Sequence, residues 1–199
     1  MSLGPGDAVL IVDVQNDFCP GGALAVEQGD QVIPVLNRIA DRAAALGLPV
    51  YASRDWHPID STHFVTHGGT WPVHCVAGTE GARLSSSLRL PSSAQIVTKG
   101  TGRDETGYSA FDGHVAGRGM LGADLHARGV IRLIVGGLAT DYCVRFSVLD
   151  ACRAGLEVAV VSDAVRAVNL APDDGARALD EMAAAGAQIA ESTEILAAE

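Results

Sequence analysis

The chain has 199 residues, of which 48% are hydrophobic and 19% are charged. These values favour one domain spanning residues 1–199 with a sizeable core, and they exclude long disordered stretches. A formal net charge of −10 argues against nucleic acid and anionic membrane as partners.

No apolar run is long enough to span a membrane, and the start of the chain has neither the basic region nor the apolar core of a signal peptide. Residues 1–6, Met-Ser-Leu-Gly-Pro-Gly, are expected to form a flexible leader. The four cysteines follow no recognisable disulfide framework, which favours a reducing, cytoplasmic location. They are Cys19, Cys75, Cys143 and Cys152.

Short apolar runs alternate with helical patterns along the chain. Strands are predicted at 7–13, 49–53, 94–98, 130–135, 157–161 and 187–190. Helices are predicted at 31–46, near 118–128, from the turn before Cys143 to Gly155, and at 172–186. This alternation is typical of an α/β fold, and we expect a doubly wound, Rossmann-like parallel sheet of six strands with helices on both faces.

The stretch 136–144 joins a predicted strand to the helical pattern that ends at Gly155. Cys143 would lie in the first turn of that helix, with Thr140 or Asp141 as its N-cap. A helix N-terminus stabilises a thiolate, so the pKa of Cys143 is expected to fall, and the free N–H groups can hold an oxyanion. The competing interpretation is a small buried thiol in a strand-to-helix turn.

Two other predicted strands end at an ionisable residue. The run 8–12 leads into Asp13, and the run 94–98 leads into Lys99. Because ligand sites of open α/β sheets lie beyond the carboxyl ends of the strands, we expect Asp13, Lys99 and Cys143 to meet there. An acid, a lysine and a cysteine in one place are typical of an activated thiol nucleophile.

A long irregular segment, residues 54–93, carries four histidines, and a loop of this length inside a domain is usually functional. Asp55 and His57 are two residues apart, so in an extended chain both side chains point to one side and can bind one cation. His74 would join them from the far end of the loop. Two imidazoles and a carboxylate suit zinc, manganese or iron, whereas the competing interpretation is a set of solvated loop histidines.

Three motifs resemble those of the isochorismatase-like cysteine hydrolases. They are Asp-Val-Gln-Asn-Asp-Phe at 13–18, Lys-Gly at 99–100 and Gly-Leu-Ala-Thr-Asp-Tyr-Cys-Val at 137–144. The resemblance runs from about residue 7 to residue 190, and within the superfamily it is strongest to the nicotinamidases, also called pyrazinamidases.

The resemblance implies an amide hydrolysis in which nicotinamide is converted to nicotinate and ammonia. Cys143 would form a thioester, Asp13 would take and return protons, and Lys99 would favour the anionic arrangement. The N–H groups of Ala139 and Cys143 would form the oxyanion hole, and the peptide between Leu138 and Ala139 would be cis. The partner would therefore be a small amide, and a homo-oligomer stays open.

The resemblance also implies one divalent metal ion, zinc first and iron or manganese otherwise, which would bind the pyridine nitrogen and orient the ring. Its ligands would be Asp55, His57 and His74, with His63 as an additional ligand. The side chains implied to contact the substrate are Phe18, Trp71, Tyr108, Leu138 and Tyr142.

Three other interpretations stay open. A metal-free hydrolase of the same superfamily could act on carbamoyl or ureido compounds, although such an enzyme does not need the implied metal ligands. A redox or metal-binding protein could use Cys143 as a sensor thiol, but Asp13 and Lys99 would then be unexplained. A flavodoxin-like nucleotide binder would have the expected fold, but the glycine pattern at 117–122 does not follow a predicted strand and is attributed to chance.

Overall fold

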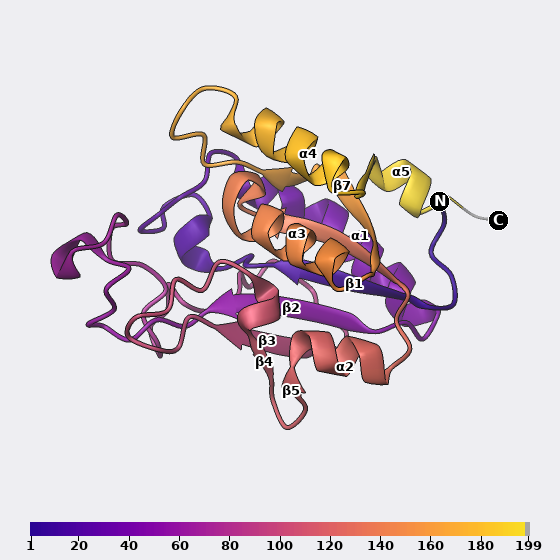
Figure 1. The fold of residues 1–199 in the computed structure, drawn as a ribbon, viewed down its shortest axis with the longest axis horizontal. Helices are drawn as coiled ribbons and strands as arrows, with labels where there is room; N and C mark the ends of the chain where they lie inside the picture. The colour runs from indigo at the N-terminus through magenta and orange to yellow at the C-terminus, as the bar shows by residue number, and fades with distance from the viewer. Residues whose placement is uncertain (198–199) are drawn as a thin grey trace.

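The strands form one sheet in the order β5-β4-β3-β2-β1-β6-β7-β8, in a computed structural model that describes residues 1–197 (Figure 1). Six of these strands run parallel to their neighbours and correspond to the six predicted from apolar runs. The parallel strands are β1 (Asp7–Val12), β2 (Val50–Asp55), β3 (Gln95–Lys99), β6 (Arg132–Leu138), β7 (Glu157–Arg166) and β8 (Gln188–Ala190).

The expected number of six strands is wrong, because the sheet has eight strands within residues 1–197. The additional strands, β4 (His114–Val115) and β5 (Gly119–Met120), form an antiparallel hairpin at the edge next to β3. Strands of two residues are too short to show an alternating pattern, so periodicity misses them. The glycine pattern at 117–122 starts in this hairpin and does not follow a parallel strand, so it lacks the context of a dinucleotide site.

Helices cover both faces of the sheet, as predicted. They are α1 (Val32–Ala45), α2 (Leu121–Ala127), α3 (Arg145–Arg153), α4 (Asp174–Ala184) and α5 (Ser192–Ile195). Apolar side chains of α1 and α5 pack into the core on one face, whereas those of α2, α3 and α4 pack into the core on the other. Among the helices of the described residues, none combines the length and apolar character needed to cross a membrane.

The first residues of the chain contact the domain, whereas the sequence predicts a flexible leader at 1–6. Leu3 is buried, and its N–H donates to the carbonyl of Ile195 at 3.3 Å. The Arg132 guanidinium donates to the carbonyl of Ser2 and forms an ion pair with Asp7. These contacts fix the chain that enters β1.

The register of the parallel strands determines where their carboxyl ends lie. Ile11 pairs with Ala52, Val12 pairs with Gly137, and Asp55 pairs with Lys99. The arrows of β1, β2 and β3 therefore point to the same side of the molecule, where the long loops gather (Figure 1). This edge is where open α/β sheets place their ligand sites.

Candidate active site

Four functional side chains meet at the carboxyl edge of the sheet, and we call them the thiol cluster: Asp13, Asp55, Lys99 and Cys143. Asp55 and Lys99 are the last residues of β2 and β3, Asp13 directly follows β1, and Cys143 lies in the turn that follows β6. These four strands are adjacent in the sheet. Lys99 Nζ lies 2.7 Å from Asp13 Oδ2 and 2.5 Å from Asp55 Oδ1, and it donates to Cys143 Sγ at 3.6 Å. The sequence thus predicted the meeting of acid, lysine and thiol, but it did not anticipate that Asp55 joins them.

The lysine at the centre of this cluster is held as a cation. Lys99 is only 1% exposed and is the only lysine in the sequence. Burial would lower its pKa, but the carboxylates of Asp13 and Asp55 outweigh burial, so the pKa of Lys99 is raised well above its usual value. A third partner, the carbonyl of Gly107, accepts another of its N–H groups. Lys99 is therefore a fixed positive charge between two acids.

The two groups that would exchange a proton both have a raised pKa. Burial raises the pKa of Asp13 by more than the Lys99 ammonium lowers it. Burial, aided by Asp13 and Asp55, raises the pKa of Cys143 well above its usual value against the opposing effect of Lys99. The expectation that the pKa of Cys143 falls is therefore wrong, because burial and the two nearby carboxylates raise it. The resting thiol keeps its proton, and a base must remove it during attack.

The turn that carries Cys143 is wider than a regular α-helical turn. Residues Thr140–Val144 form a single π-helical turn, η5, that leads into α3, and its N-cap is Ala139. The predicted N-caps, Thr140 and Asp141, are therefore wrong. The Asp141 carboxylate instead accepts hydrogen bonds from the N–H groups of Val168 and Asn169, at 2.9 and 2.8 Å. The peptide between Leu138 and Ala139 is cis, as the resemblance implied.

A second group, which we call the histidine cluster, lies next to the thiol cluster and consists of His57, His63 and His74. One ring nitrogen from each histidine lies within 4.8 Å of the others. His57 Nε2 also lies 3.7 Å from Asp55 Oδ2, so Asp55 connects the two clusters. The structure thus brings together the three predicted ligands and the predicted additional ligand, His63.

The rings of the histidine cluster are oriented as metal ligands. The Nδ1 atoms of His57 and His74 face the carbonyls of Gly100 and Pro72, at 3.0 and 2.7 Å, which leaves each Nε2 lone pair available. His57 Nε2 is buried and has no hydrogen-bond partner among the described residues. Burial and the neighbouring imidazoles lower the pKa of His63 to about 4, which keeps that ring in the neutral, ligating form. An orphaned buried nitrogen beside two further imidazoles and a carboxylate fits a zinc-type cation.

Two polar side chains whose roles the sequence did not reveal hold both clusters in place. Gln15 Nε2 donates to the carbonyls of Asp55 and Ala82, and its Oε1 accepts the N–H of Asp55 at 2.8 Å. The Asp17 carboxylate accepts the N–H of Cys75, next to His74, at 2.7 Å. Gln15 and Asp17 belong to the motif at 13–18, but only the structure shows that they tie the long loop to the sheet.

A cavity opens onto both clusters. Cys143, Ala139, Asp55, His63 and His74 contribute its polar end. The apolar wall contains the predicted Phe18, Trp71, Tyr108 and Tyr142, together with Leu24 and Val168, which the sequence did not indicate.

Trp71 Nε1 donates to the hydroxyl of Tyr108 at 2.9 Å, which fixes two of the aromatic rings of this wall. The predicted substrate contact Leu138 does not line the cavity, because its fully buried side chain packs in the core on the α1 face. It is the next residue, Ala139, that faces the cavity.

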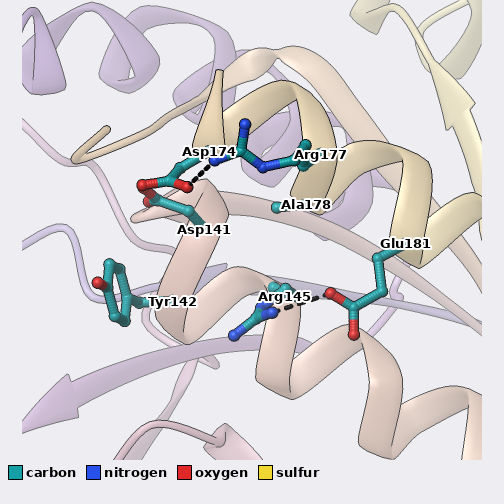
Figure 2. A pocket seen from close by; sticks show the side chains of 7 residues that line it. All are labelled: Asp141, Tyr142, Arg145, Asp174, Arg177, Ala178 and Glu181. Atoms are coloured by element: carbon teal, nitrogen blue, oxygen red, sulfur yellow. Dashed lines mark hydrogen bonds and ion pairs between the residues drawn. The ribbon is translucent and has the colours of Figure 1, made fainter. Parts of the chain in front are cut away.

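A second pocket lies on the other side of η5, between η5, α3 and α4 (Figure 2). Tyr142 and Asp141 leave the turn in different directions, so that Tyr142 lines both pockets while Asp141 lies beside Asp174 (Figure 2). Arg145 pairs with Glu181 at 2.8 Å, and Arg177 pairs with Asp174. The Arg145–Glu181 ion pair therefore joins α3 to α4 across this pocket.

The chain is similar to known proteins along nearly its whole length. A model of the isochorismatase domain matches residues 7–194. The nicotinamidase of Escherichia coli (strain K12) is 42% identical, over 93% of this chain and 94% of the relative.

Solved structures agree. The pyrazinamidase of Pyrococcus horikoshii in complex with zinc is 41% identical with a TM-score of 0.86, over 94% of this chain and 99% of that one. PnC1 from L. infantum in complex with nicotinate is 32% identical with a TM-score of 0.86, over 100% of this chain and 99% of that one. These similarities show that the chain belongs to the isochorismatase family, within which it is an enzyme, a hydrolase of amides similar to the nicotinamidases.

Proposed function

We propose that the protein is a nicotinamidase that hydrolyses nicotinamide to nicotinate and ammonia, and that it also accepts pyrazinamide. One observation carries the proposal: a buried thiol next to an acid and a lysine shares its cavity with a group of histidines that could bind one metal ion. The similarity to the E. coli nicotinamidase and to structures solved with zinc and with nicotinate supports it.

The first half of the reaction makes a thioester. Asp13 takes the proton from Cys143 as the sulfur attacks the amide carbon, since the pKa of the thiol is too high for it to ionise alone. The N–H groups of Ala139 and Cys143, at the cavity wall, hold the negative charge that develops on the carbonyl oxygen. The carbon–nitrogen bond then breaks, and Asp13 returns its proton to the departing ammonia.

The second half of the reaction hydrolyses the thioester. Water attacks the acyl carbon, and Asp13 accepts one of its protons. The carbon–sulfur bond breaks, the proton returns from Asp13 to Cys143, and nicotinic acid leaves and releases its remaining proton to water as nicotinate. Lys99 stays positively charged throughout and balances the charge that passes between Asp13 and the sulfur.

Asp55, His57, His63 and His74 would hold one divalent cation, for which zinc is the best match to the donor set. When bound, this ion supplies a Lewis acid that can bind the ring nitrogen of a pyridine amide. The aromatic side chains Phe18, Trp71, Tyr108 and Tyr142 would enclose the ring and exclude water from the acylating carbon.

Ammonia release from nicotinamide tests the proposal, measured with the zinc-loaded protein and after removal of the metal by a chelator. We expect steady turnover by the loaded protein, a large loss after chelation and recovery when zinc is added back. A loaded protein that releases no ammonia from nicotinamide or pyrazinamide would contradict the proposal.

A further inference from the structure

Ser53 is a buried serine near the end of β2 that contacts Asp13 twice. Its side chain is fully buried. Its hydroxyl donates to Asp13 Oδ1 at 2.7 Å, and its oxygen accepts the backbone N–H of Asp13 at 3.3 Å. A serine hydroxyl has one proton to donate. Because the N–H of Asp13 occupies the acceptor side of the hydroxyl, that proton is directed at Oδ1.

The other oxygen of the same carboxylate has a different environment. Asp13 Oδ2 is buried and forms an ion pair with the Lys99 ammonium at 2.7 Å. The same ammonium also contacts Asp55 Oδ1, the carbonyl of Gly107 and Cys143 Sγ. Oδ2 therefore shares the Lys99 ammonium with Cys143 Sγ, whereas Oδ1 is held by Ser53.

This asymmetry gives the two oxygens different tasks. We propose that Ser53 is a positioning residue, which holds Oδ1 of Asp13 and thereby presents Oδ2 as the oxygen that exchanges the proton with Cys143. The inference rests on the proposed function, in which Asp13 is the acid and base of the reaction. The proton of Cys143 passes to Oδ2 as the sulfur attacks, and it passes from Oδ2 to the leaving nitrogen when the amide bond breaks.

Removing the Ser53 hydroxyl would affect the chemical steps and not the binding of the amide. Without its donor, Asp13 Oδ1 is a buried acceptor with one partner fewer, and the carboxylate can rotate away from the sulfur. Misplaced proton transfer lowers kcat by roughly 10- to 100-fold. Ser53 is not part of the cavity wall, so KM for nicotinamide should change by less than about twofold.

The test compares Ser53→Ala with Ser192→Ala, using zinc-loaded protein and nicotinamide. Ser192, the first residue of α5, is a matched control because it is also buried. Its hydroxyl donates to the carboxylate of Asp163 at 2.6 Å. Both variants lose one serine–carboxylate hydrogen bond. Bound zinc is measured in each, since Ser53 lies two residues before Asp55. We expect full zinc content in both variants and a fall in kcat only for Ser53→Ala.

A second pair of variants isolates the hydroxyl from the volume of the side chain. Ser53→Thr keeps the hydroxyl, whereas Ser53→Val has nearly the same shape without it. We expect kcat of the threonine variant to exceed that of the valine variant at least fivefold. Equal kcat values for these two, or a Ser53→Ala variant within twofold of wild type, would overturn the role of Ser53.

Asp13→Asn in the same series separates this inference from the proposed function. If Asp13→Asn is inactive and the Ser53 variants keep full kcat, the positioning role is wrong while the proposed function stands. If Asp13→Asn still turns over nicotinamide, Asp13 is not the base, and both the mechanism and the role of Ser53 fail.

Discussion

The thiol cluster and the histidine cluster lie side by side, yet the fold holds them in different ways. Asp13, Asp55 and Lys99 lie at the ends of neighbouring strands, where the sheet register fixes their positions, and Cys143 lies in the turn that follows β6. The histidine cluster lies on one irregular segment between β2 and β3. That segment is held by isolated bridges, such as the one from His57 to Val76, and by side chains that bond its backbone.

This difference suggests how the two functions are divided. Groups that move protons need fixed geometry, and a parallel sheet provides it without any ligand. Groups that hold a metal can come from a loop, because the ion itself and the hydrogen bonds behind the ligands complete the geometry. Variants of the thiol should therefore leave zinc binding intact, and variants of the histidines should leave the reactivity of Cys143 intact. The predictions below test that separation.

The largest effect is expected from Cys143→Ala. The thioester cannot form, so kcat for nicotinamide should fall by on the order of 10⁴-fold or more, while zinc binding at the histidine cluster is unchanged. Steady-state kinetics and metal analysis check both parts. Cys152→Ala, which removes a half-buried thiol from α3, is the control and should keep wild-type kcat. A Cys143→Ala variant with substantial turnover would rule out the thiol as nucleophile.

The next largest effect distinguishes the role of the metal site from the reactivity of the thiol. His57→Ala should lower kcat/KM for nicotinamide by roughly a thousandfold, because the ring nitrogen loses its anchor, but it should change the poor turnover of benzamide little. Iodoacetamide should still alkylate Cys143. His67→Ala is the control, since His67 is an exposed histidine of the same loop. Equal losses for both amides would show that the ion only supports the loop.

A smaller effect is expected from Gln15→Ala, which removes the side chain that bonds the backbone of Asp55. The affinity for zinc should fall by about 10- to 100-fold, as for other partners of metal ligands, and kcat at saturating zinc should change less. Isothermal titration with zinc measures this. Gln95→Ala, which removes a surface amide bonded to Ser93, should bind zinc like wild type. Unchanged zinc affinity in Gln15→Ala would show that the loop positions its ligands alone.

The smallest effect concerns the pH dependence of the thiol. The Lys99 ammonium lowers the pKa of Cys143, so its removal in Lys99→Met should raise that pKa further. The rate of alkylation by iodoacetamide follows the thiolate, and its profile should therefore shift to higher pH by about one unit or more. A profile that stays in place, or moves to lower pH, would exclude an electrostatic role for Lys99.

The sequence predicted those features that depend on short, local patterns. Six apolar runs became the six parallel strands, and the residues that follow them, Asp13, Lys99 and Cys143, met as expected. The hairpin of β4 and β5 escaped notice because two-residue strands leave no periodic signal. The wall residues Leu24 and Val168 come from loops whose positions depend on distant hydrogen bonds, such as that from the Val168 N–H to Asp141.

The wrong expectation for the Cys143 pKa has a clear physical origin. The sequence showed a thiol at a helix start, where backbone N–H groups favour a thiolate. It did not show that the sulfur would be buried beside two carboxylates, both of which raise its pKa, as does burial itself. Likewise, Leu138 is part of the motif, but its side chain points into the core, a direction that depends on the backbone at the end of β6.

The most direct test of the central claim is to identify the acyl intermediate. Zinc-loaded wild-type protein is quenched with acid during turnover of saturating nicotinamide, and its peptides are analysed by mass spectrometry. We predict a nicotinoyl group on the peptide that contains Cys143, absent without substrate and absent in Cys143→Ala. Steady turnover with no acylated peptide, or with the acyl group on another residue, would contradict the thioester mechanism.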